Sequence, residues 1–407
     1  MDGYVPYDDL ANVFSSAGAA AGLEDLISAL QAGGDHHGLF RALLLKKRHE
    51  LGLPLLNPGD LTGCPEGVRK EYKAYVDSTC RDVGTRYLDA GDIAQAWRYL
   101  RSIGEPGPVR AALEKLETKS VPEEVLRIAL EEGVHPRRGF QMALDSHGLG
   151  RAIQVFESGF SSAFADRQYA AALLVRTLYN DLVRAVCKAI LLRFNQLPPE
   201  LELVELVRSR PWLFEKDGIH ADAHHIAAVA RLGLIVEDTT DLIMVLSINE
   251  YGRMLSSVHQ PSVRAPFEGG FADQAKYARA LLGENVDEIV EHFRNKLSYY
   301  QSSSADTSPV ELTMRLLRRA GRRDEALDLW QQYLGTQAPE RPGAIIPSFY
   351  ELCFEAKAYS RLADMARQQS DTTAWAAARI MESSAAPPVA PTPADAPADK
   401  KDPDDLS

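Results

Sequence analysis

Hydrophobic residues recur at every third or fourth position along most of this chain, which is the spacing of amphipathic α-helices. The pattern is clearest in residues 77–108. There, Val83, Tyr87 and Leu88 mark one apolar face before Gly91. A second face follows and holds Ile93, Ala96, Trp97, Leu100 and Ile103. We therefore predict two short antiparallel helices, with Gly91 in the left-handed conformation that closes a helix.

Other residues of this segment fit the same hairpin. Gly84 lies on the inner side of the first helix, where the absence of a side chain lets a second helix approach closely. Asp92 can cap the second helix, and Gln95 follows three residues later, as in a capping box. Pro106 and Pro108 end the unit, because proline lacks the amide that a helix interior needs.

The spacing resembles that of the tetratricopeptide repeat. The repeat's small, aromatic, turn-glycine, alanine, bulky, small and proline positions are occupied by Gly84, Tyr87, Gly91, Ala96, Leu100, Ile103 and Pro108. Cys80 stands where the repeat usually has tryptophan, and Ile103 where it usually has alanine. A partial second match covers residues 317–330, where Gly321, Ala326 and Trp330 keep the same offsets.

This resemblance implies an all-α protein built as a right-handed α-α superhelix of tetratricopeptide-like hairpins. One such unit cannot bury its own apolar face, so further hairpins are expected on both sides. The first helices of the repeat family line a concave groove that holds peptides or partner helices. Carried over to this chain, the groove positions are Ser78, Arg81, Thr85, Leu88 and Asp89.

Glycine, proline and composition divide the chain into five parts. We predict an N-terminal helical pair in residues 1–65, tetratricopeptide-like hairpins in 66–160 and a central helical module in 161–260. Further hairpins follow in 261–382, with polar residues 302–307 as a linker. Residues 383–407 are rich in alanine, proline and aspartate and are predicted to be disordered, since they cannot bury enough apolar surface to fold.

The central module is organised around one long predicted helix, residues 166–194, which contains no glycine or proline. Its apolar stripe is wide and includes Leu191 and Leu192, so we expect a helix buried on several sides. Residues 234–248 have a β-branched content that would also suit a strand hairpin. We favour helix, turn, helix there, because Asp238 is a credible cap and no Asn-Gly turn is present.

Capping residues and charge set two further expectations. Ser120 with Glu123, and Ser308 with Glu311, have the spacing of capping boxes that open helices. Paired glutamates at positions 123–124 and 131–132 are interpreted as solvated helix faces and not as catalytic pairs. The acidic N-terminus differs from a signal peptide, and we expect no apolar run long and uncharged enough to cross a bilayer.

Composition narrows the classes of function. The 407 residues carry a formal net charge of −12, which argues against a broad nucleic-acid-binding surface. The four cysteines are scattered, without the paired spacing of structural zinc, and are expected to be reduced thiols in the cytoplasm. They are Cys64, Cys80, Cys187 and Cys353.

One histidine cluster is the candidate chemical site. If residues 219–232 are helical, His220 and His224 share a face, as two metal ligands would, and Asp217 lies near it. Arg231 continues the same stripe, and a cation there favours a carboxylate or phosphate over a divalent metal. The plainer interpretation is that Asp217 caps the helix and the histidines sit on a polar face beside a groove.

The sequence therefore favours a protein–protein interaction or scaffolding protein that takes a protein or peptide partner. We expect it to lack catalytic activity, a cofactor, and nucleic-acid or membrane partners. The alternative is a metal- or anion-binding protein, or an enzyme, with its site near His220 and His224. A third option is a structural subunit of a larger assembly.

Overall fold

The computed structural model describes residues 7–56, 61, 63–161, 163–261, 266–297, 308–335 and 346–385. All regular structure in these ranges is helical, and they contain no strand, so the all-α prediction is confirmed. Contacts divide the chain into two compact units, Met1–Pro261 and Ser262–Ser407. Each unit has its own set of neighbouring helices.

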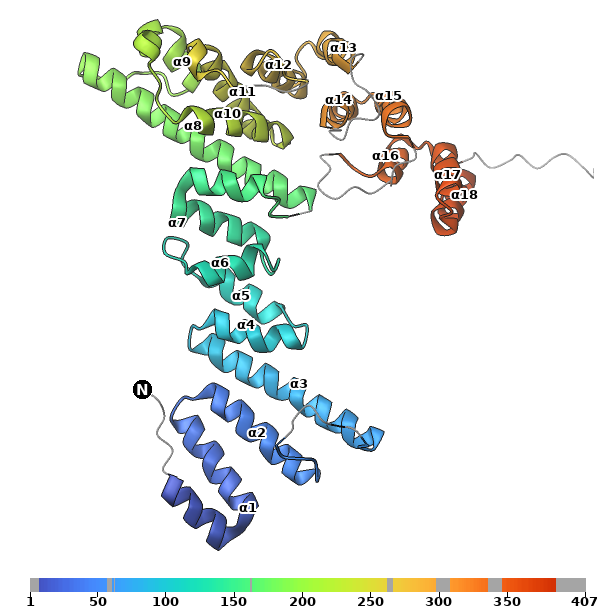
Figure 1. Cartoon of the computed structure of the whole chain (residues 1–407). Helices are drawn as coiled ribbons and strands as arrows, with labels where there is room; N and C mark the ends of the chain where they lie inside the picture. The colour runs from blue at the N-terminus through green and yellow to red at the C-terminus, as the bar shows by residue number, and fades with distance from the viewer. Residues whose placement is uncertain are drawn as a thin grey trace, which may run out of the picture. The chain divides into compact units, whose positions relative to one another are not determined.

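The first unit begins with helices that each pack against the next in the chain (Figure 1). Their bounds are α1 Tyr7–Ala32, α2 His36–Glu50, α3 Glu66–Asp89 and α4 Ile93–Ser102. The predicted hairpin is confirmed as α3 and α4. Gly91 has a φ of 79°, and the Asp92 carboxylate accepts a hydrogen bond of 2.9 Å from the Gln95 amide.

Close contact between α3 and α4 depends on Gly84. Val83 and Leu100 are fully buried between the helices. A Cβ atom on Gly84 would lie 2.7 Å from Cγ of Leu100, which is closer than carbon atoms pack. The predicted role of Gly84 in letting α4 approach is therefore confirmed.

The next helices continue the series. They are α5 Gly107–Lys115, α6 Glu123–Leu130 and α7 Pro136–Glu157. The chain turns inside α7 at Gly148, which has a φ of 78°. The predicted capping box at Ser120 is wrong. The N-cap position of α6 is occupied by Pro122, which forms no side-chain capping hydrogen bond. Ser120 lies two residues before this position, so its hydroxyl is not the cap.

The long helix α8, Phe164–Phe194, is the centre of the rest of this unit, because three shorter helices pack on it. These are α9 Leu203–Arg208, α10 Ala223–Leu232 and α11 Thr239–Arg253. Asp238 caps α11, so the helical interpretation of residues 234–248 is confirmed. Short helical turns connect these elements: η1 Pro211–Asp217, η2 Gly233–Ile235 and η3 Ser257–His259.

Burial of α8 is less complete than its sequence predicts. Leu174, Leu178 and Leu182 form the expected buried stripe. However, Leu191 and Leu192 are 39% and 78% exposed. The prediction that the helix is buried on several sides is wrong for its last turn, because the elements that cover α8 leave that turn open.

One helix of the described ranges, α1, is long and apolar enough to cross a membrane by length and composition alone. Only 11% of its most apolar window is buried. The expectation that no such run exists is therefore wrong by this criterion. Alanine raises the mean hydropathy here without adding large apolar side chains, and Gly18 interrupts the helix with a φ of 87°.

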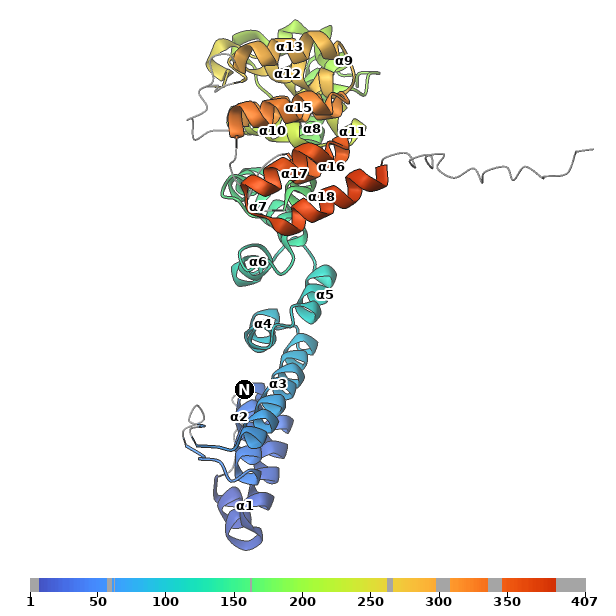
Figure 2. The same ribbon diagram turned by 90° about the vertical axis from the view of Figure 1, so that its right-hand side faces the viewer.

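The second unit is a series of neighbouring helices, and Figure 2 shows α17 and α18 lying side by side. The bounds are α12 Phe271–Leu281, α13 Val286–Leu297, α14 Ser308–Arg319, α15 Arg323–Leu329, η4 Trp330–Leu334, α16 Phe349–Ala356, α17 Tyr359–Gln368 and α18 Thr372–Ala385. These match the predicted hairpins. The predicted linker 302–307 and the predicted disorder of 386–407 lie outside the described residues, whereas 383–385 are helical.

A buried carboxylate links α12 to α13 at the start of the second unit. Asp273 in α12 is 7% exposed at its side chain and accepts hydrogen bonds from the amide of Gly269 and the ammonium of Lys296, both 2.6 Å. His292 Nε2 lies 3.1 Å from its other oxygen. Burial raises the pKa of the Asp273 carboxyl, but the contacts with Lys296, Gly269 and His292 together outweigh burial and lower it.

This lowered pKa predicts an acid-sensitive second unit. The stabilisation is present above the unfolded pKa of about 3.8 and is lost as pH falls through the lower folded value. We expect Asp273→Asn to destabilise α12 and α13 at pH 7, with a difference from the unsubstituted chain that shrinks below about pH 4. Amide exchange of α12 and α13 peptides, referenced to α8 peptides at each pH, measures this.

Asp287→Asn is the matched control, because Asp287 is 95% exposed at its side chain. It is expected to leave the exchange of α12 and α13 unchanged at every pH. A constant difference between Asp273→Asn and the unsubstituted chain from pH 7 to pH 3 would contradict the role given to Asp273.

Candidate functional site

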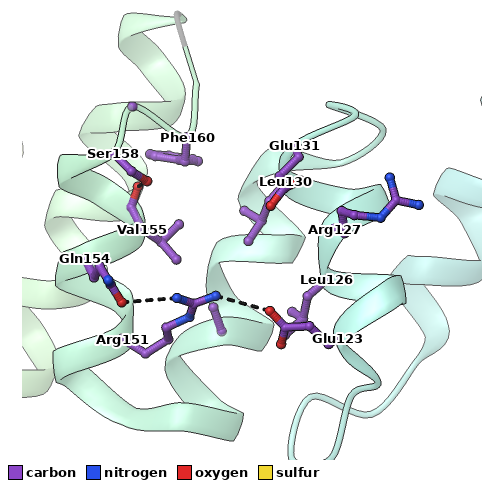
Figure 3. Close-up of a pocket in the computed structure, with 12 residues that line it drawn as sticks. Glu123, Leu126, Arg127, Leu130, Glu131, Arg151, Gln154, Val155, Ser158 and Phe160 are labelled. Atoms are coloured by element: carbon purple, nitrogen blue, oxygen red, sulfur yellow. Dashed lines mark hydrogen bonds and ion pairs between the residues drawn. The ribbon is translucent and has the colours of Figure 1, made fainter.

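A cavity of about 330 Å³ lies between α6 and the second half of α7 (Figure 3). Its apolar lining includes Leu126 and Ala143, which belong to the buried core of this part of the first unit. Leu130 and Val155 pack against the same core and are only partly buried. The cavity is therefore an opening in the surface that exposes core side chains at its floor.

The backbone conformation of α7 makes this opening. In the first half of α7, Gly139 lies so close to α6 that a Cβ atom there would be 2.8 Å from Ala129 and Leu130. After Gly148 the chain takes a new direction, and the second half of α7 carries Arg151 and Val155 along the other wall of the cavity. Gly139 thus allows the close approach of α6 and α7, and Gly148 sets the direction of the second wall.

Charged side chains line the rim. Arg151 donates a hydrogen bond of 3.1 Å to Glu123 across the cavity and another of 3.1 Å to Gln154 on its own helix (Figure 3). Glu131 is exposed at the same rim. Arg127 completes the rim, with a bond to the carboxylate of Glu132. The rim carries two cations and two carboxylates around an apolar floor.

Glu132 fixes the position of Arg127. Its carboxylate also accepts a hydrogen bond of 2.7 Å from Nε1 of Trp97, and it lies 2.9 Å from Arg101. Burial raises the pKa of this carboxyl, but the contacts with Trp97, Arg127 and Arg101 together lower it. Glu132 therefore stays ionised at neutral pH and links α4 to α6.

The sequence interpretation did not identify this site. Positions 123–124 and 131–132 are interpreted above as solvated faces, yet Glu123 and Glu131 lie on the rim and Glu132 is largely buried. The available signal was the spacing of Glu123, Arg127 and Glu131 at four-residue intervals, which places them on one face of a helix. Nothing in the sequence indicated Arg151 as the partner of Glu123.

The histidine cluster does not have the arrangement predicted for a metal site. Asp217 is not the cap of α10. The cap is Asp222, whose carboxylate accepts a hydrogen bond of 2.9 Å from the His224 amide. The helix therefore starts after His220, so His220 and His224 do not share a helical face. Within the described ranges, no group of three or more His, Cys, Asp or Glu side chains is placed to hold a metal ion.

His220 has a structural environment. Its Nδ1 lies 2.8 Å from the hydroxyl of the fully buried Tyr251, and the same hydroxyl accepts a hydrogen bond of 3.0 Å from the His220 amide. Burial lowers the pKa of the His220 imidazole. Arg231, proposed above as the cation of an anion site, instead binds Glu157 at 2.6 Å. These contacts hold the residue stretch before α10 against α11 and connect α10 to α7.

The five predicted groove positions lie on α3, spread over one side of the helix. Two of them already have partners outside α3, and the hydroxyls of Ser78 and Thr85 each donate a hydrogen bond of 2.9 Å to a carbonyl oxygen of α3 itself. Arg81 forms a bidentate contact with the Glu105 carboxylate that includes a hydrogen bond of 2.9 Å from Nε, and Leu88 packs against the core. Thr85 and Asp89 are exposed, and Ser78 is half-buried.

Comparison of the chain with protein-family models, with curated proteins and with solved structures finds no match.

Proposed function

We propose that this chain is a binding or scaffolding protein that holds a protein or peptide partner on stacked helical hairpins. The observation that carries this proposal is the cavity between α6 and α7, with its apolar floor and charged rim. An apolar anchor side chain in a small pocket, surrounded by polar contacts, is the arrangement that dominates the energy of many protein interfaces.

The rim residues suit recognition of an extended peptide. The Glu131 carboxylate has no hydrogen-bond or ionic partner among the described residues and can accept from a peptide amide or a basic side chain. Arg151 can exchange its contact with Gln154 for a peptide carbonyl while Glu123 keeps it in place. Leu130 and Val155 supply the apolar surface that an anchor side chain would cover.

We extend the proposal to the architecture and to α3. The close contact of Gly84 with Leu100 and the left-handed Gly91 support a tetratricopeptide-like hairpin. We propose that the hairpins of the first unit follow a right-handed superhelix of that kind. In this proposal Thr85 and Asp89 form a second contact region for the partner. Ser78 and Leu88 flank it, while Arg81 shapes its edge through Glu105. The four cysteines are free thiols, which supports our proposal of a cytoplasmic location.

A substitution that fills the cavity mouth tests the proposal. Ser158→Trp adds a large side chain at an exposed rim position without replacing a core residue. We expect peptides selected on the full chain from a random phage-displayed library to bind this variant at least tenfold more weakly. Fluorescence anisotropy with the selected peptides measures the effect.

Ser28→Trp is the matched control, because Ser28 is an exposed serine on α1, outside the cavity. It is expected to leave peptide affinity unchanged. Selection that enriches no peptide sequence, or peptides that bind Ser158→Trp as tightly as the unsubstituted chain, would count against the cavity as the site. Peptides lost instead on Asp89→Ala would move the site to α3.

A further inference from the structure

Exposed apolar side chains gather at the C-terminal end of α8. Of the fourteen large hydrophobic side chains exposed in the described part of the chain, five lie within residues 191–201. They are Leu191, Leu192, Phe194, Leu197 and Leu201, with exposures of 39%, 78%, 57%, 63% and 82%. An apolar group of this density on a soluble surface marks a site of interaction.

The geometry of the helix end limits what can cover it. Residues 191–194 are consecutive and all exposed, and successive helical positions are about 100° apart. Together they cover most of the circumference of the helix, apart from the side of Phe194 and Arg193 that contacts Trp212, and α8 ends there at Asn195 in a left-handed conformation. A flat protein surface or a single helix buries one side of such an end. A lipid layer surrounds an inserted end on every side.

The local charge is opposite in sign to that of the whole protein. Residues 182–199 contain three cations, Arg184, Lys188 and Arg193, and no acid, in a chain with a net charge of −12. Arg184 is partly offset by Asp181. The next acids are Glu200, which Arg210 holds at 3.0 Å, and the exposed Glu202 beside Leu201. Positive charge therefore predominates along the α8 side of the apolar end, where it complements an anionic surface.

Trp212 adds an interfacial anchor. Its ring lies 5.7 Å from the ring of Phe194, and the guanidinium carbon of Arg193 lies 4.3 Å from its centroid. Tryptophan is enriched where a membrane meets water, and arginine extends its charge toward the headgroups while its stem lies on apolar surface. Arg193 and Trp212 thus combine both features beside Phe194.

We propose that the end of α8 is a docking surface for a membrane that contains anionic lipids. Leu192, Phe194 and Leu197 enter the boundary between headgroups and acyl chains, while Lys188 and Arg193 bind lipid phosphates. This proposal concerns a surface distinct from the cavity between α6 and α7, so each can fail without the other. It departs from the expectation of no membrane partner that composition gives.

Vesicle flotation of the full chain tests whether the end of α8 binds anionic membranes. We expect binding to vesicles of phosphatidylcholine with phosphatidylserine and little binding to vesicles of phosphatidylcholine alone. Added salt should weaken the binding, because it screens charges beyond about 10 Å. Leu192→Glu with Phe194→Glu should lower the vesicle partition coefficient at least tenfold. Lys188→Ala should lower it about fivefold, the contribution of one basic residue near an anionic surface.

Val258→Glu is the matched control, because Val258 is 70% exposed in η3 and lies outside residues 191–201. It should bind like the unsubstituted chain, and all variants should keep the circular dichroism spectrum. The proposal is overturned if the unsubstituted chain does not bind vesicles of phosphatidylcholine with phosphatidylserine at low salt. It is also overturned if the variant with both Leu192→Glu and Phe194→Glu binds these vesicles as well as the unsubstituted chain. A dimer that the double variant abolishes in sedimentation velocity would overturn it in favour of a second copy. Binding of inorganic phosphate in calorimetry without vesicle binding would overturn it in favour of a free anion.

Discussion

Replacing Leu100 by alanine is expected to destabilise the first unit by roughly 2–5 kcal/mol, the range for removing a buried leucine side chain. Leu100 is fully buried in α4, and its Cγ fills the space that Gly84 leaves open on α3. Alanine would leave a cavity that the helices cannot close without moving. Urea unfolding followed by circular dichroism measures the loss, and amide exchange of α3 and α4 peptides assigns it to this hairpin.

A second substitution makes this test specific. Gly84→Ala alone should destabilise the hairpin, since its Cβ meets Leu100 Cγ at 2.7 Å, although alanine favours the helix by about 1 kcal/mol. Combined with Leu100→Ala, the same methyl group enters the cavity. The double variant should therefore be more stable than Leu100→Ala, a coupling expected only of residues in contact.

An exposed leucine provides the control for this series. Leu192→Ala removes the same atoms from a position that is 78% exposed, and it should change stability by less than about 0.5 kcal/mol. The close contact of α3 and α4 would not be a source of stability if Leu100→Ala lowered the free energy of unfolding no more than Leu192→Ala does. The same conclusion would follow if the double variant were the least stable of the set.

Local signals explain which parts of the fold were predictable. Gly91 and Asp92 act on the residues next to them, so glycine conformation and capping predicted the hairpin of α3 and α4. The prediction failed where two acceptable caps competed. Asp217 and Asp222 both precede α10, and only tertiary contacts, including that of His220 with Tyr251, decide between them.

The candidate site was less predictable because its residues come from separate helices. Arg151 and Glu123 are far apart in sequence and meet only because Gly139 lets α6 pack closely on α7. At the exposed end of α8 the apolar residues are evident in the sequence, but their exposure is not. Leu191 and Leu192 have the spacing of core residues, and periodicity alone cannot tell a covered stripe from one that extends past its neighbours.

Replacing Arg176 by alanine is expected to destabilise the first unit by about 3 kcal/mol. Arg176 of α8 donates hydrogen bonds of 2.7 and 2.9 Å to the two oxygens of Asp241 in α11, whose side chain is only 2% exposed. Removing the cation leaves a buried carboxylate without its partner, which costs roughly 3–5 kcal/mol in protein interiors. Arg176 is 53% exposed at its side chain, so water reaches the pair and the lower end of that range applies.

Two variants separate the buried charge from the loss of a surface arginine. Arg184→Ala, on the same helix, breaks a contact with Asp181 in which the side chains are 77% and 42% exposed, and should cost less than about 0.5 kcal/mol. Arg176→Ala with Asp241→Asn removes the uncompensated charge, so urea unfolding should show that it recovers more than half of the loss. If the double variant were no more stable than Arg176→Ala, the cost would come from packing of the arginine stem, and the ion pair would not be what holds α11 on α8.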